Sequence, residues 1–439
     1  MKTISKLPVL LTFLYALATS PTLLAAANYP TTIGLSQING AEKERMRLAQ
    51  GHKKFDQQPT GFYVDSGKKV VVKVEILTPA ADGASPMLII GTLGFNLNGR
   101  TKSEHALSSG KNTIAATHGG LIYLSYVANS GKSPVGKARI TFEAESEHVQ
   151  APRYVHGSTS DAEFVKMLVS YPTPDVIYQS PYAVVVATLE NAIRYKEKRN
   201  EWMQGLHALL EREDEISGMD NSDPNPVHHR LKAGEVRYLL VNNTSPSPHA
   251  SAAGYTGYPP GAASRYLTSF GSGNNSWMLG HEIGHQHQQP AYQISQATES
   301  TVNIYSYVVE RSLQGSGYNR TTADKWKKAQ ETYLRLPVER RVYDMNSDSL
   351  QAIIGFNRDE LRFMPWEQLF IIFGDEFYRR LHRIVREEEV TGGSEQDRRL
   401  YLIWKASQIT GYDLCEFFNQ WGIRVTEKAN VDTLQARIG

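Results

Sequence analysis

The sequence contains the pattern His-Glu-x-x-His once, at residues 281–285. If this stretch is helical, His281 and His285 lie four residues apart on one face, so both imidazoles can bind one metal ion while Glu282 lies beside it. The pattern therefore predicts a helix at this point and the site of a zinc hydrolase on its exposed face.

A catalytic zinc ion usually has three protein ligands and keeps a fourth position for water. The class in which a third histidine completes the set needs Gly at position 288 and His at position 291. This chain has Gln288 and Ala291, so that class is excluded. His287 is a poor substitute because it lies two residues from His285 and points away from the ligand face. We interpret His287 as a surface residue or a support for the ligands.

Glu299 is the best candidate for the third ligand. Pro290 ends the first helix, and residues 286–298 are enough for a turn that brings a second helix back against it. The alternative is that Glu299 only caps or solvates its own helix. We predict one Zn²⁺ per chain, bound by His281, His285 and Glu299.

Two kinds of helper residue complete the predicted site. Asn303 lies one helical turn after Glu299 and can hydrogen-bond the outer atom of a ligand. Glu282 is predicted to be the general base, which takes a proton from the zinc-activated water and passes it to the leaving nitrogen. The candidates for oxyanion stabilisation or substrate binding, which the sequence does not rank, are His249, Tyr255, Tyr258 and Tyr305.

Small residues at 252–254 precede the predicted zinc helix and are compatible with an edge strand. An extended peptide could pair with such a strand, and Tyr255 and Tyr258 could stack on a sugar. The alternative is a Gly- and Pro-rich loop whose aromatic side chains belong to the core.

The patterns along the chain predict an α+β fold. Residues 28–150 contain short alternating strands separated by turn residues, and predict a β-sandwich-like accessory domain. Residues 151–439 are predicted to form the metallopeptidase domain, with the zinc site in about 151–315 and a mostly helical subdomain in about 316–439.

Three elements are expected between the sandwich and the zinc helix. A helix at 160–170 follows a cap-like Thr-Ser-Asp sequence. A long helix is expected at 182–210, and a strand at 236–241.

Residues 1–27 have the features of an export signal: two lysines, an apolar body and three alanines before Asn28. The alternative is a membrane anchor, because residues 7–27 are uncharged and long enough to span a bilayer. Pro8 and Pro21 interrupt the segment and favour cleavage. We therefore predict an exported protein, periplasmic or secreted, with no membrane span after signal cleavage.

Composition narrows the possible partners. The net charge of +2 and the lack of a basic stripe give no reason to expect nucleic acid. Cys415 is the only cysteine, so the exported chain has no intramolecular disulfide. We interpret Cys415 as a small buried hydrophobic residue. We also expect the protein to be a monomer.

The run at 281–288 together with 299–306 resembles the enhancin-like zinc metallopeptidases, which include viral enhancins and bacterial mucin-directed peptidases. Further similar stretches lie at 249–259, 410–414 and 417–422. The resemblance implies a gluzincin peptidase fold, zinc on the two histidines and the downstream glutamate, and cleavage of O-glycosylated, mucin-like proteins outside the cell.

Two features depart from the family pattern. Ser300 and Thr301 stand where more Val and Asn character is expected, and the chain lacks additional glycan-binding modules. These departures bear on which substrate the chain cleaves more than on which metal it binds.

Two other functions remain open. The chain could be a glycan-binding colonisation or adhesion protein with an incidental zinc site, or a peptidase indifferent to glycans. An intact Glu282 beside intact ligands argues against a degenerate site.

Overall fold

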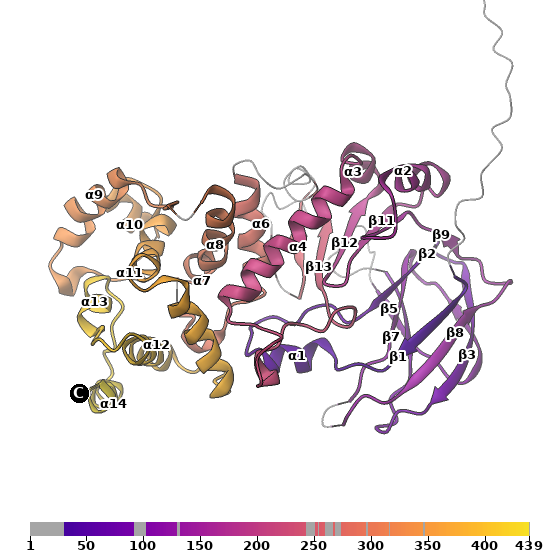
Figure 1. Cartoon of the computed structure of the whole chain (residues 1–439), viewed down its shortest axis with the longest axis horizontal. Coiled ribbons are helices and arrows are strands. Elements are labelled where there is room, and N and C mark those ends of the chain that lie inside the picture. Colours follow the sequence, from indigo (N-terminus) through magenta and orange to yellow (C-terminus); the bar gives the residue numbers. More distant parts are fainter. Residues whose placement is uncertain are drawn as a thin grey trace, which may run out of the picture.

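The computed structural model describes residues 30–91, 102–129, 132–242, 251–252, 254–259, 267, 274–295, 297–315, 317–345 and 347–438. The molecule is elongated, with a β-rich part at one end, a mixed sheet with helices in the middle and a helical part at the other end (Figure 1). The predicted α+β fold is confirmed. The predicted export signal lies outside the described residues.

Two antiparallel sheets form the N-terminal sandwich, next to the short helix α1 (Ala41–Arg47). One sheet has the order β1 (Thr32–Ser36), β8 (Lys137–Phe142), β3 (Lys69–Thr78) and β6 (Gly110–Ala115). The other has the order β5 (Ser103–Ala106), β4 (Met87–Ile90), β7 (Gly120–Ser125), β2 (Gln58–Val64) and β9 (Val149–Gln150). Alternate residues of β3 (Val70, Val72 and Val74) are buried in the core between the sheets, as alternation predicts.

A six-stranded mixed sheet forms the middle of the molecule. Its order is β10 (Arg153–Val155), β11 (Asp175–Gln179), β12 (Ala183–Thr188), β13 (Tyr238–Asn242), β15 (Thr256–Tyr258) and β14 (Ser251–Ala252). One face packs on helices α2 (Asp161–Ser170), α3 (Leu189–Arg194), α4 (Arg199–Ile216) and α6 (Asn274–Gly284). The other face packs on the sandwich.

The long helix predicted at 182–210 is wrong in its first part and confirmed in its last part, which α4 covers. Its first part is strand β12, which pairs in parallel with β13 and antiparallel with β11. Val184 and Val186 face the sandwich while Val185 faces the helices, so both sides of the strand are buried. A short apolar run of valines is typical of such a strand, and its length cannot distinguish it from the start of a buried helix.

Helices dominate the C-terminal part. They are α7 (Thr298–Thr301), α8 (Asn303–Gln314), α9 (Ala323–Glu331), α10 (Ser347–Ile354), α11 (Arg358–Glu387), α12 (Glu395–Thr410), α13 (Cys415–Gln420) and α14 (Lys428–Ile438). Short 3₁₀ turns occupy Pro226–His228, Pro290–Tyr292, Tyr333–Arg335 and Val338–Arg340. Within the described part of the chain, no helix combines the length and apolar character needed to cross a membrane.

The sandwich and the mixed sheet share one hydrophobic cluster. Phe55 and Tyr123 come from the sandwich side and pack edge to face, with ring centroids 5.5 Å apart. The same cluster contains Ile177, Val184 and Leu239 of the mixed sheet. Exposing this apolar surface to water costs free energy for both the sandwich and the mixed sheet. We therefore expect the two parts to unfold together.

We predict that Phe55→Ala lowers the free energy of unfolding by about 3–5 kcal/mol, because it removes a buried ring from a packed cluster. Calorimetry should show one transition, shifted to lower temperature. Val169→Ala, at a side chain that is 79% exposed, is the matched control and should change little. Two separate transitions, of which only one moves, would contradict a shared core.

Candidate metal centre

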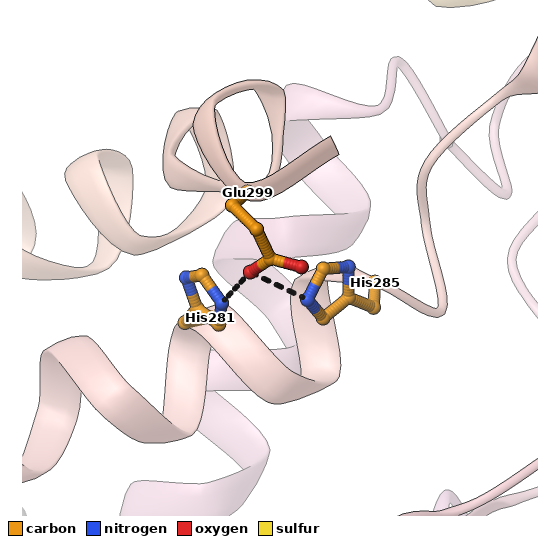
Figure 2. A group of neighbouring side chains, drawn as sticks. All are labelled: His281, His285 and Glu299. Atoms are coloured by element: carbon orange, nitrogen blue, oxygen red, sulfur yellow. Dashed lines mark hydrogen bonds and ion pairs between the residues drawn. The ribbon is translucent and has the colours of Figure 1, made fainter. Parts of the chain in front are cut away.

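Helix α6 carries both histidines of the pattern, and α7 carries Glu299 (Figure 2). After α6 the chain turns, makes a 3₁₀ turn that starts at Pro290, and returns so that α7 faces the metal helix. The Nε2 atom of His281 lies 3.0 Å from Oε2 of Glu299, and Nε2 of His285 lies 3.7 Å from the same oxygen. The three side chains therefore meet although Glu299 lies well downstream in the chain.

The outer nitrogens of both histidines are engaged by amide oxygens. Nδ1 of His281 lies 2.9 Å from Oδ1 of Asn303, and Nδ1 of His285 lies 2.7 Å from Oε1 of Gln288. An amide oxygen only accepts, so both Nδ1 atoms carry the proton. The Nε2 atoms, which face Glu299, are then the ones that would lose a proton and offer a lone pair to a metal ion.

The orientation of the two amides is itself determined. The amide nitrogen of Asn303 donates to the carbonyl oxygen of Glu299 at 2.9 Å. The amide nitrogen of Gln288 donates to the carbonyl of Thr298 and to the hydroxyl of Thr301, both at 2.8 Å. Thr301, which departs from the expected family pattern, therefore has a structural role in holding Gln288.

This donor set fits a catalytic zinc ion. Candidate ligand atoms of His281, His285 and Glu299 all lie within 4.8 Å of one another. Hydrogen bonds from His281 and His285 hold the pKa of the Glu299 carboxyl well below its usual range, so it is an anion. Two imidazole nitrogens and one carboxylate oxygen are a known set of catalytic zinc ligands.

Glu282 follows the first histidine in α6 and is 8% exposed. Burial raises the pKa of its carboxyl, and the charges of His281 and His285 offset part of this rise. A carboxylate with a raised pKa is suited to exchanging a proton near neutral pH.

The four candidates for oxyanion stabilisation or substrate binding differ in their surroundings. Tyr305 is buried, and its hydroxyl lies 2.8 Å from Nε2 of His382, so we correct its oxyanion role to one in the core. Tyr258 is fully buried, so it cannot stack on a sugar, although the charge of Glu282 contributes to its raised pKa. Tyr255 is half-buried against the cluster shared with the sandwich. His249 lies outside the described residues.

Sequence reasoning missed one residue of the site and left two interpretations of another open. Gln288 was used only to exclude a ligand class, although its position three residues after His285 could have indicated its contact. His287 is not a surface residue but fully buried. Its Nδ1 lies 3.1 Å from Glu213, and its Nε2 lies 3.1 Å from Asp214.

Two carboxylates flank His287 and favour its charged form. Burial alone would lower its pKa, but hydrogen bonds to Asp214 and Glu213 raise it. Its ring also stacks on Tyr238, with centroids 5.3 Å apart. His287 thus connects the turn after α6 to α4 and to the mixed sheet, behind the metal ligands.

Comparison with known proteins gives two family matches. The model of the family described as Peptidase M60, enhancin and enhancin-like matches residues 147–422. The N-terminal domain of M60-like peptidases matches residues 39–141.

Among curated proteins, the chain is 26% identical over 288 residues to the accessory colonization factor AcfD of Vibrio cholerae. The match covers 59% of this chain but only 17% of that protein. The ZmpB metallopeptidase of Clostridium perfringens has a TM-score of 0.70 at 20% identity, over 92% of this chain and 80% of that one. A metallopeptidase in complex with Tn antigen has a TM-score of 0.72 at 15% identity, over 93% and 77% of the two chains. At these identities the solved structures establish the fold.

We predict that Asn303→Ala weakens zinc binding by about 10–100-fold, because His281 loses the acceptor that orients its ring. Competition with a chromogenic chelator measures the affinity. Asn303→Asp keeps an acceptor oxygen for His281 but loses the bond to the Glu299 carbonyl, so its affinity should lie between those of the alanine variant and the unchanged chain. Equal affinity in the alanine variant would show that the contact does not support the ligand.

Proposed function

The chain belongs to the M60 metallopeptidase family of enhancin and enhancin-like proteins, and on this basis we propose that it is an exported zinc endopeptidase that cleaves O-glycosylated, mucin-like proteins. One observation carries the proposal. His281, His285 and Glu299 converge with both outer imidazole nitrogens hydrogen-bonded, and Glu282 lies beside them.

His281, His285 and Glu299 are the residues that would hold zinc. When bound, zinc lowers the pKa of water and polarises a carbonyl group. Glu282 acts as the general base that accepts the proton of the attacking water and passes it to the leaving nitrogen. Asn303 and Gln288 keep the two imidazoles in the tautomer that ligation needs.

The position of the mixed sheet supports a peptide substrate. Strand β14 is at the edge of this sheet and lies against α6. An extended peptide can add to such an edge through main-chain hydrogen bonds, which places its backbone next to the metal ligands. We therefore propose that the substrate pairs with β14.

Several findings support the wider proposal. A structural neighbour was solved in complex with Tn antigen. The two family matches, at 39–141 and 147–422, support an accessory domain at 28–150 and a metallopeptidase domain at 151–439. Residues 1–27 are proposed as an export signal on their sequence alone. We propose a monomer in the periplasm or outside the cell.

A second candidate function follows from the similarity to an accessory colonization factor, of which the chain spans 17%. In that case the chain binds glycans and the zinc site is incidental. Zinc-loaded protein that binds glycoprotein but does not cleave it would favour this second function.

We predict that Glu282→Gln retains zinc but lowers the cleavage of mucin by about 10²–10⁴-fold, since the amide cannot accept the proton. Zinc content by metal analysis and digestion of mucin by electrophoresis measure the two effects. Removal of zinc by a chelator should abolish cleavage in the unchanged chain, and added zinc should restore it. Equal cleavage by both proteins would refute the mechanism.

A second prediction concerns glycan dependence. One peptide with and without O-linked GalNAc, digested under the same conditions and analysed by mass spectrometry, should be cleaved only in the glycosylated form. Faster cleavage of the bare peptide would instead identify a peptidase indifferent to sugars.

A further inference from the structure

A polar cavity lies between α4 and the second part of α11. Helix α11 is broken at Gly374, whose φ of 69° and ψ of −172° are not helical, so residues 375–387 form a separate helical part. The cavity between this part, the end of α4 and the turn at 218–221 has a volume of about 760 Å³. This volume is within the range of sites that bind small molecules. The residues that line the cavity do not include the proposed metal ligands or the side chains that bond them.

The turn after α4 is attached firmly to α11. The buried guanidinium of Arg386 donates to the carbonyl oxygens of Ser217 at 2.8 Å and of Gly218 at 2.9 Å. Gly218 has a φ of +63°, and a Cβ atom placed there would be 2.6 Å from the carbonyl oxygen of Arg379. Glycine is therefore needed for this close approach, which holds the walls of the cavity in place.

Two smaller cavities adjoin the main one along α11. A cavity of about 240 Å³ shares Arg212, Glu215 and Arg379 with it. A cavity of about 310 Å³ shares Arg380 and Arg383 with it. We call the three together the α11 groove. It follows residues 375–387, a helical length of roughly 20 Å, and therefore fits an extended ligand better than a single ion.

The lining of the main cavity is suited to a ligand rich in hydroxyl groups. Carboxylates only accept hydrogen bonds and guanidinium groups only donate them, whereas a sugar hydroxyl does both. Both kinds of group are present, as Glu211, Glu215, Asp220 and Glu376 and as Arg212, Arg230, Arg379, Arg380 and Arg383. Of the described residues that line this cavity, Met219 has the one apolar side chain. Peptides that bind in grooves need apolar anchor sites, so the lining favours a carbohydrate.

Arg379 is the unpaired charge of the groove. The other arginines of the main cavity lie beside carboxylates, which are Glu215 for Arg212 at 2.5 Å, Asp214 for Arg230 at 2.6 Å, Asp223 for Arg383 and Glu376 for Arg380 at 3.8 Å. The guanidinium of Arg379 forms no ion pair or hydrogen bond with any residue that the structure describes. It lines both the main cavity and one of the smaller cavities. A planar guanidinium without a partner is suited to a carboxylate of the ligand.

We propose that the α11 groove binds an acidic sugar chain. The carboxylate of the sugar pairs with Arg379, and its hydroxyl groups bond the surrounding carboxylates and arginines. This site is separate from the metal centre, so the proposal goes beyond the peptidase function and does not depend on it.

The test uses the full chain loaded with zinc and three soluble probes. Sialyllactose is an acidic trisaccharide, lactose is its neutral part, and inorganic phosphate is an oxyanion without a sugar. Isothermal titration calorimetry measures the binding of each probe to the unchanged chain, Arg379→Gln and Arg379→Lys. Arg194→Gln, at an exposed arginine of α3 that pairs with Glu190, is the control for the loss of one surface charge.

We expect the unchanged chain to bind sialyllactose more tightly than lactose, because only the acidic sugar pairs with Arg379. Arg379→Gln should weaken sialyllactose binding about tenfold, as for the loss of a hydrogen bond to a charged group, and leave lactose binding unchanged. Arg379→Lys keeps the charge but not the planar fork, so its affinity should lie between the two. Arg194→Gln should bind like the unchanged chain.

Two results of the titration would overturn the proposal. Equal binding of sialyllactose by the unchanged chain and by Arg379→Gln would show that Arg379 does not hold the sugar. Phosphate that binds as tightly as sialyllactose would show a site for an oxyanion and not for a carbohydrate.

Hydrogen exchange followed by mass spectrometry locates the bound sugar. Sialyllactose should slow exchange at residues 217–221 and 376–387. Protection confined to residues 281–299 would instead place the sugar at the metal centre and refute the groove. The titration does not require cleavage, so a chain that fails to digest mucin would contradict the peptidase function and leave the test of the α11 groove intact.

Discussion

The side-chain amide of Gln288 joins the two halves of the metal centre. Its oxygen accepts from His285, and its nitrogen donates to Thr298 and Thr301 on the returning chain that carries Glu299. One planar group thus sets the tautomer of one ligand and the position of the helix that supplies another. The site depends on this amide because the first ligand pair and the third ligand lie on separate helices, which local helical geometry cannot align.

Behind the ligands, buried charges hold α6 in place. His287 lies between Glu213 and Asp214, and Arg230 donates to the second carboxylate at 2.6 Å. Burial raises the pKa of Glu213 to about 7, although His287 opposes the rise. Buried charges are tolerated when they are paired and hydrogen-bonded, and their geometry is then demanding. This network fixes the direction in which α6 presents its ligand face.

The sandwich contributes to the site as well as to the core. It covers one face of the mixed sheet through a shared hydrophobic cluster. The chain between α1 and β2 also reaches the turn after the metal helix, where Lys54 donates to the carbonyl of Gln286. Strand β14 of the mixed sheet also lies against α6.

Local patterns in the sequence were enough to predict the metal helix and the alternating strands of the sandwich, because each depends on the period of one element. Glu299 was a candidate because Pro290 ends the first helix and the following residues are enough for a turn. The capping box of α2, in which Ser160 and Glu163 bond each other, was also visible as a Thr-Ser-Asp start. Tertiary structure alone decided that residues 183–188 form a strand, that His287 is buried and that Lys54 contacts Gln286, 232 residues away. These outcomes depend on partners distant in the chain. The spacing of residues within one segment does not show which distant groups will bury that segment or pair with its charges.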